Sequence, residues 1–388
     1  MIYESSRISK DLSERLSVRF MKLRFTLQML EDAHLPRYKN SALRGGMGQM
    51  LIAGNCILDR RCGDRQKQKA KKADIDEQIV PANDFFGDEA PGNNGIKEGG
   101  GSASGENAQK ICRKLATYNL CPYEEECIVR RLMYAKFRIQ PPFASEGDSI
   151  GYSVFCPDYN EDVPAGYLLR FELTLFGRLL VHLNPILQAF HALGQAGLGA
   201  EHARFRIVAI ENSRREPILD GTNIYLSRYV PETLESYVLR RLPHLSEKLT
   251  LRFRTPATLK HEREFLEHFD PEVILSACAR RLYMLDCFEG IDQPQVAVGE
   301  VMDEGENEEN RVLHIPVPRL VSETSIHTII PRYSSTQSTR INLHGIRGGV
   351  ELAEVSEETR ILLAVGEVMQ IGKNVSMGFG KYNIVDTK

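Results

Sequence analysis

Hydrophobic and polar residues alternate along several stretches of the chain in the way that β-strands require. Residues 17–29 (SVRFMKLRFTLQM) place apolar side chains at every second position, as in a half-buried strand. Residues 249–254 (LTLRFR) alternate in the same way, and 166–177 and 205–210 also favour strands. Each half of the sequence therefore predicts its own set of strands.

Helical periodicity separates these strands. Residues 40–53 and 357–370 each carry an apolar stripe at helical spacing, and Asn184-Pro185 and Asp270-Pro271 have the residue types that open helices. Further predicted elements are a connecting helix at 231–242 and strands at 312–317 and 326–333. Both halves then have the order strand, helix, strands, strand, helix, glycine-rich turn, strand. We interpret this order as an α+β fold with two tandem ferredoxin-like (βαββαβ) domains.

The predicted domain borders follow from this repeat. The first domain covers residues 1–217, a linker covers 218–245, and the second domain covers 246–388. Residues 63–110 lose periodicity and end in GGGSASG, which indicates a flexible insertion in the first domain. Residues 111–130 form a cysteine-containing segment behind it.

Charge is unevenly distributed, so the net charge of −3 over 388 residues describes no surface well. Acidic residues cluster at 84–89 and 303–309, whereas 311–349 holds five arginines and a single acidic residue. No apolar run reaches the roughly 18 residues of a membrane span. The sequence begins without the basic and apolar segments of a secretory signal, so we expect a cytoplasmic protein.

Eight cysteines in such a chain suggest thiols or a metal site more than disulfides. The tightest pair is Cys121 and Cys127, whose five intervening residues exceed the spacing of common zinc knuckles. A tetrahedral structural zinc site would use Cys112, Cys121 and Cys127 with Cys62 or Cys56. Reduced structural cysteines are the alternative interpretation.

A glycine-rich stretch, QIGKNVSMGFGKYNI at 370–384, joins the last predicted helix to the last strand. Its glycines allow close approach of a ligand, and its polar side chains can donate to phosphate oxygens. The candidate phosphate-binding residues of this stretch are Gly372, Lys373, Asn374, Ser376, Gly378, Gly380 and Lys381. The alternative is a helix C-cap followed by a turn. A nucleotide-binding P-loop is excluded because five residues separate Gly366 from Gly372 and Asn374 replaces the metal-binding Ser or Thr. We therefore expect no nucleotide cofactor.

Several local patterns, in this order, resemble the RAMP proteins of CRISPR systems. The resemblance is closer to their endoribonucleases that process precursor crRNA, and it is poor over 63–110. The patterns are PRYKNSALRG (36–45), Cys121-Pro122, PPF (141–143), FELTLFG (171–177), ALGQAGLG (192–199), LRFRTP (251–256), RYSSTQ (332–337) and IGKNVSMGFG (371–380).

The resemblance implies an enzyme that binds CRISPR repeat RNA and cuts it without a metal cofactor. The ribose 2′-OH attacks the adjacent phosphate, leaving a 2′,3′-cyclic phosphate and a 5′-OH. The resemblance also implies a second interpretation, a non-catalytic RAMP subunit that holds crRNA within a CRISPR effector complex. Partners would be the RNA and other effector subunits, with no membrane involved.

Such chemistry needs a base, an acid and cations. Related enzymes often carry a histidine on the first helix, but residues 40–53 contain none. We predict His34 as general base, Tyr38 as acid or orienting group, and Lys39 or Arg44 as charge stabiliser. His344 is a second catalytic candidate, and an exposed loop position is the alternative for His34.

RNA binding through shape and phosphates suits arginines near glycine-rich turns. The predicted phosphate contacts are Arg332, Arg340, Arg347, Lys373 and Lys381. Ordinary surface charge is the alternative for this group. The glycine-rich stretch would act as a backbone clamp on RNA.

Overall fold

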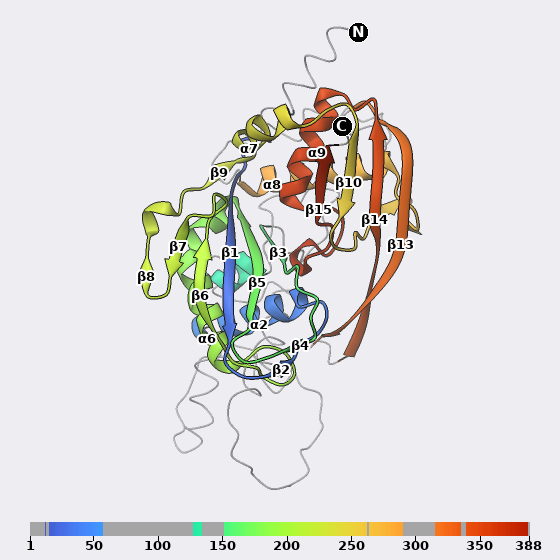
Figure 1. Ribbon diagram of the computed structural model, residues 1–388. Coiled ribbons are helices and arrows are strands. Elements are labelled where there is room, and N and C mark those ends of the chain that lie inside the picture. Colours follow the sequence, from blue (N-terminus) through green and yellow to red (C-terminus); the bar gives the residue numbers. More distant parts are fainter. Residues whose placement is uncertain are drawn as a thin grey trace, which may run out of the picture.

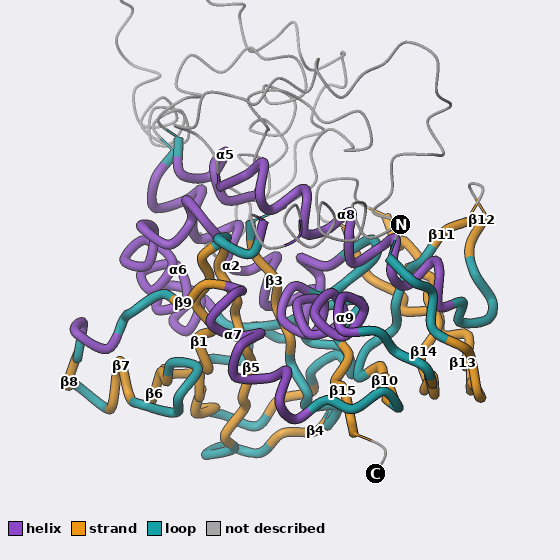
Figure 2. The backbone as a smooth tube through the Cα atoms, turned by 90° about the horizontal axis from the view of Figure 1, so that it is seen from above, coloured by secondary structure: helices purple, strands orange, loops and turns teal. Residues whose placement is uncertain are grey.

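The computed structural model describes residues 12, 15–56, 127–133, 151–261, 264–289, 315–334 and 339–386. Two antiparallel sheets lie side by side, and helices cover them mainly from one side (Figures 1 and 2). The predicted insertion at 63–110 lies outside the described residues, and so does most of the cysteine segment.

The first sheet has the strand order β3-β5-β1-β6-β7-β8, and β9 pairs with β1. Its strands are β1 (Arg19–Met29), β3 (Tyr152–Phe155), β5 (Leu168–Phe176), β6 (Phe205–Glu211), β7 (Pro217–Asp220), β8 (Asn223–Ile224) and β9 (Glu232–Thr233). The helices are α2 (Asn40–Asn55), α5 (Ile128–Met133), α6 (Leu183–Ala196) and α7 (Leu234–Arg241), and the small strands β2 (Ala33–His34) and β4 (Asp162–Val163) pair beside them. Alternating residues of β1 are buried, as the sequence predicts.

An aromatic cluster forms the centre of the first core. Phe25 of β1 lies directly opposite Phe171 of β5, and their rings stack with centroids 4.7 Å apart. Phe190 of α6 packs on both rings, at 5.1 Å from each. Burying such side chains contributes about 2–3 kcal/mol each, so this cluster fixes the helix against the sheet.

The second sheet has the order β13-β14-β10-β15. Its strands are β10 (Leu249–Phe253), β13 (Arg319–Ser334), β14 (Thr339–Ala353) and β15 (Tyr382–Asp386). Helices α8 (Pro271–Glu289) and α9 (Glu357–Met369) pack together on it, and a small hairpin is formed by β11 (Lys260–His261) and β12 (Glu264–Phe265). In both sheets the first strand of the unit lies between the third and the fourth, with the second at one edge. The predicted pair of ferredoxin-like domains is confirmed.

Two local predictions need correction, and one strand was not predicted. The predicted linker, 218–245, contains β8 and β9, which are bonded into the first sheet. The predicted strand at 312–317 is not formed over its described part, and one long strand, β13, begins at Arg319. Its partner β14 was not predicted because three glycines interrupt its apolar pattern. At Gly345 a Cβ atom would lie 3.0 Å from the carbonyl oxygen of Ala257, so a larger residue would be tightly packed there.

Among the described residues, no helix is long and apolar enough to cross a membrane.

Candidate functional site

Helix α2 begins at the junction between the two sheets, and Lys39 anchors that beginning. The Lys39 side chain is fully buried, and its Nζ donates to the carbonyl oxygens of Asp158 (3.2 Å) and Asn160 (2.5 Å). The Asp158 carboxylate lies 3.6 Å from the same ammonium. Lys39 therefore holds the 158–160 loop against the helix. The prediction that it stabilises a reacting phosphate is wrong for this structure, because its charge is enclosed and already satisfied.

Tyr38 lies at a contact between the two domains. Its half-buried ring meets Tyr159 edge to face, with centroids 5.6 Å apart. The Tyr159 hydroxyl donates to the carbonyl oxygen of Arg254, just after β10, at 2.9 Å. Burial raises the pKa of Tyr159, so this hydroxyl stays protonated and keeps donating.

His34 points into an acidic environment. Its Nδ1 lies 2.8 Å from the Asp162 carboxylate, and its backbone N–H donates to Glu201. The hydrogen bond with Asp162, assisted by Glu161 and Glu201, raises the pKa of the imidazole. The neighbouring carboxylates repel a phosphate, which disfavours this position for an RNA substrate.

A cationic cavity of about 310 Å³ lies between α2, α8 and the glycine-rich loop. Arg44 contributes from α2, Lys260 from β11, and Lys373 from the loop. Its five basic lining residues, all described, are Arg44, Lys260, Arg280, Arg281 and Lys373. None of the described lining residues is acidic. Ser276, Asn374 and Ser376 add polar groups to the wall, so the cavity has the chemistry of a phosphate-binding site.

The glycine-rich loop is shaped by close backbone contacts. Gly372 and Gly378 have positive φ angles of 82° and 84°. A Cβ atom on Gly378 would lie 2.2 Å from the Asn40 side chain of α2 and 2.6 Å from the Val154 carbonyl oxygen of β3. A Cβ atom on Gly380 would lie 1.8 Å from the carbonyl oxygen of Ile371. The loop is thus the joint between the two domains, and its inner glycines are packed against protein.

Only part of this loop is available to a ligand. Lys373 is exposed and Ser376 lines the cavity, whereas Gly378 and Gly380 are buried. Lys381 is 5% exposed, and its Nζ donates to the carbonyl oxygen of Glu367 at 2.6 Å. Burial lowers the pKa of Lys381 to about 8. Its prediction as a phosphate contact is therefore wrong for this structure.

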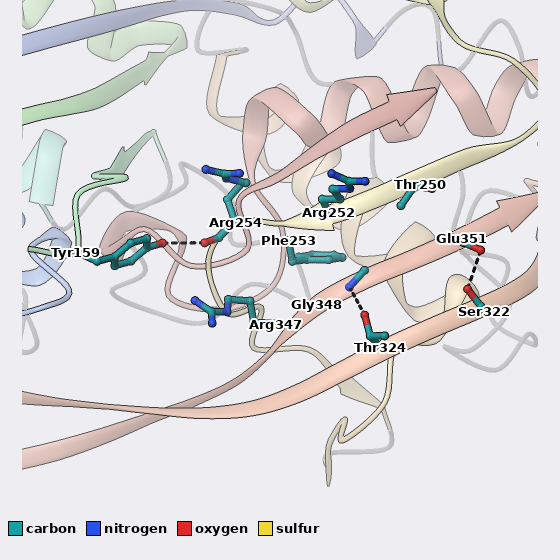
Figure 3. A pocket seen from close by; sticks show the side chains of 11 residues that line it. Tyr159, Thr250, Arg252, Phe253, Arg254, Ser322, Thr324, Arg347, Gly348 and Glu351 are labelled. Atoms are coloured by element: carbon teal, nitrogen blue, oxygen red, sulfur yellow. Dashed lines mark hydrogen bonds between the residues drawn. The ribbon is translucent and has the colours of Figure 1, made fainter. Parts of the chain in front are cut away.

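A second cavity, of about 470 Å³, lies on the outer face of the second sheet (Figure 3). Arg252, Arg254 and Arg347 line it together with Tyr159, which points toward Arg254. One acidic residue, Glu351, is present and accepts a hydrogen bond from Ser322 at 2.8 Å. Of the predicted phosphate contacts, Arg347 lies here and not with Lys373.

The remaining predicted residues have separate environments. Arg332 donates to the sulfur of Met377 at 2.8 Å, beside the glycine-rich loop. The Arg340 side chain lies outside the described residues. His344 is half-buried, and its carbonyl oxygen accepts from the hydroxyl of Thr258 at 2.6 Å. The predicted catalytic group is therefore divided: Tyr38, Lys39 and Arg44 belong to α2 and its approach, and His344 belongs to β14.

The predicted zinc site cannot be placed. Cys62, Cys112 and Cys121 lie outside the described residues, and Cys127 is a half-buried free thiol beside the core. Within the described ranges, no group of three or more His, Cys, Asp or Glu residues has metal-site geometry.

Sequence reasoning missed Tyr159, Lys260 and Arg280. Arg280 lies on α8, whose apolar face was recognised, and its polar face gave no signal by itself. Arg252 and Arg254 were detectable as the polar side of the alternating LTLRFR strand.

Two family models match the sequence. The model described as "CRISPR-associated endoribonuclease Cas6" matches residues 251–382, and a model described as an N-terminal domain matches 16–72 and 107–233. The resemblance predicted from the sequence is confirmed over residues 251–382, the part of the chain that the Cas6 model matches. No curated protein matches the chain.

Solved structures give weak similarities. A Cas6 product complex has 14% identity and a TM-score of 0.43 over 95% of this chain and all of the other. Cas6 of Thermus thermophilus has 12% identity and a TM-score of 0.42 over 95% of this chain and 99% of the other. The chain covers 46% and 29% of two matched chains from Cas6-RT-Cas1–Cas2 complexes, at 8% identity and TM-scores of 0.45. With TM-scores below 0.5, these similarities assign no role to any residue.

Proposed function

We propose that this chain is a Cas6-like protein of the CRISPR RAMP superfamily. We further propose that it binds CRISPR repeat RNA and cleaves it without a metal ion. The observation that carries the proposal is the cavity between α2, α8 and the glycine-rich loop, which has five basic lining residues and no acidic one among those described. Other CRISPR subunits are proposed as further partners that receive the processed RNA.

RNA phosphates supply the negative charge that such a cavity requires. Arg44, Arg280 and Lys373 approach it from three different elements, so a backbone that passes through it is contacted from several sides. Each neutralised phosphate releases counterions, which makes binding sensitive to salt. The rigid joint beneath Lys373 keeps its backbone fixed, so less order has to be gained when RNA binds.

The proposed reaction is an internal transfer at phosphorus. The ribose O2′ loses its proton to a base and forms a bond to the adjacent phosphorus, while the P–O5′ bond breaks and O5′ takes up a proton. The products are a 2′,3′-cyclic phosphate and a 5′-OH. Arg44, Arg280 and Lys373 are proposed to stabilise the charge on the phosphorane. His344 is our candidate base because it lies next to the cavity: the hydroxyl of Thr258, a cavity residue, donates to its carbonyl oxygen.

One observation favours a second function, RNA binding without cleavage. The described residues that line the cavity include no imidazole, and His34 is held by carboxylates. Without an imidazole in its wall, the cavity would bind a phosphate but provide only charge stabilisation.

The decisive experiment incubates the full chain with its own CRISPR repeat RNA in EDTA. Cleavage of the ribose substrate, with none of a substrate carrying a 2′-deoxy group at the cut site, is the expected result. Cleavage that requires added metal would overturn the proposed chemistry. Tight binding without cleavage would establish the second function instead.

Variants test the cavity itself. Arg280→Ala and Lys373→Ala are expected to weaken RNA binding, measured by filter binding at two salt concentrations. Lys248→Ala removes an exposed lysine outside the cavity and is the matched control. Equal losses in all three variants would show that general surface charge, and not this cavity, binds the RNA.

A further inference from the structure

A row of planar side chains crosses the open face of the β13–β14 hairpin. Phe265 of β12 lies 6.2 Å from His344 of β14, with ring planes 27° apart. His344 in turn lies 5.5 Å from His327 of β13, with ring planes 36° apart. We call Phe265, His344 and His327 the ring platform. Three rings at these spacings come from three separate strands, so the fold brings them together.

The pairing of the strands explains this arrangement. His327 pairs with Ile346 and Ile329 with His344, so the two histidines are diagonal neighbours on one face of the hairpin. Further along the same face, Glu323 accepts hydrogen bonds from His268 and from the backbone N–H of Phe269. The segment that contains His268 and Phe269 therefore covers that end of the face. The ring platform is the part that it leaves open.

The platform is accessible to solvent. Phe265 is 49% exposed and Ile329 is 48% exposed, although both are large apolar side chains. His327 is exposed and His344 is half-buried. Exposed planar groups of this kind do not contribute to a core, and the domain gains nothing in stability from leaving them in water.

The platform continues into the cationic cavity. Lys260 lines that cavity, and its Nζ also lies 4.0 Å from the centroid of the Phe265 ring. Thr258, another cavity residue, donates to the carbonyl oxygen of His344 and forms a bridge with Lys373. A chain whose phosphate occupies the cavity would therefore have its next bases beside the rings.

We propose that the ring platform binds unpaired nucleobases of the RNA by stacking, next to the phosphate held in the cavity. This inference rests on the proposed function. Every base has a planar face, so stacking on Phe or His tolerates any sequence, and a neighbouring cation follows the backbone. A protein partner fits less well, because Lys260 lies over Phe265 and the adjoining cavity is strongly basic.

The test combines protein variants with RNA lacking single bases. Each nucleotide of the repeat RNA is replaced in turn by an abasic nucleotide, which keeps the phosphate and removes the ring. For the wild-type chain, one or two positions are expected to lose about tenfold in affinity. With Phe265→Ala and His327→Ala combined, the intact RNA should lose about as much, and those same positions should lose nothing further. Phe265→Tyr keeps the ring and should behave as the wild type.

The outcomes separate this inference from the proposed function. If the wild-type chain does not bind the intact repeat, the proposed function fails. If it binds and the abasic losses are the same in wild type and variant, the platform does not contact bases and only this inference is overturned. Circular dichroism of each variant confirms that it folds. A variant that binds all RNAs normally would also overturn the inference, and a protein-binding surface would then be the better explanation of the exposed rings.

Discussion

The two glycine-rich turns occupy the same place in their domains but serve different purposes. Each joins the second helix of a βαββαβ unit to its last strand. In the first domain, a Cβ atom on Gly197 would lie 2.0 Å from the carbonyl oxygen of His202, within the same turn. In the second domain, Gly378 meets Asn40 and Val154, which belong to the other domain. One turn closes on itself, and the other connects two domains.

This difference shows how a repeated element acquires a function. The glycines satisfy a local steric requirement in both copies, so glycine alone does not identify a site. What distinguishes the second copy is Lys373, which is exposed and lines a basic cavity beside α2 and α8. The site arises where the second turn meets the first domain.

The largest effect is expected from breaking the joint. Gly378→Ala places a methyl group against Asn40 and Val154 at a positive φ angle, and should destabilise the chain by about 4 kcal/mol. Gly197→Ala should also destabilise, because His202 is equally close. Urea denaturation measures both. Gly221→Ala, whose φ is 56° but whose surroundings are open, is the control and should cost about 1 kcal/mol.

RNA affinity separates the two turns further. Of the Gly378→Ala and Gly197→Ala molecules that remain folded, only the former should bind repeat RNA more weakly. Equal affinity in both would contradict the role of the joint in positioning the cavity.

The lysine at the end of the second turn gives the next largest effect. Burial lowers the pKa of Lys381 to about 8, whereas the unfolded chain keeps this proton until about pH 10.5. Between these values the unfolded state binds more protons, so stability rises with pH, by about 3 kcal/mol in total. Chemical denaturation from pH 7 to 10.5 should show this rise in the wild type and not in Lys381→Met.

Arg204 provides the matched control at the corresponding position before β6. It is exposed and forms a surface ion pair with Glu31, at 3.4 Å. Arg204→Met should therefore change stability by less than about 1 kcal/mol and leave the pH dependence as in the wild type. If both variants lost the rise, another group would be responsible for it.

A smaller effect is expected at the exposed part of the second turn. Lys373→Ala should reduce RNA affinity about tenfold at low salt and lower the slope of log affinity against log salt by about 1. An unchanged slope in titrations at several salt concentrations would mean that Lys373 contacts no phosphate.

The smallest effect is expected at His34. Because Asp162, Glu161 and Glu201 surround it, His34→Ala should change the cleavage rate by less than about twofold. Single-turnover kinetics on repeat RNA measures this. A large loss of cleavage with unchanged binding would restore His34 as the general base.

The order of elements could be predicted from the sequence because burying one face of a strand or helix directly sets the spacing of its apolar residues. The strand at Arg19–Met29 and the helix at Glu357–Met369 follow their apolar patterns closely. Strand β14 was not predicted because its glycines lower the local strand propensity. They are present because neighbouring backbone, at Ala257 and across the hairpin, lies too close for side chains.

The site was harder to predict for the same physical reason. Lys39 and Lys381 look like surface cations in the sequence, yet each is buried and bonded to carbonyl oxygens. Whether a lysine faces solvent depends on contacts from distant segments, such as the 158–160 loop that encloses Lys39. Lys373 differs from them because only its backbone is engaged, in a bridge with Thr258, and its side chain is left exposed.

The contact of Gly378 with Asn40 also bears on how the chain folds. It joins segments near opposite ends of the sequence, so its formation closes a very long loop and belongs among the late, slow events of folding. During synthesis the surface formed by α2 and β3 is made long before the loop that covers it. We expect this surface to be the part of the nascent chain that most needs protection from aggregation.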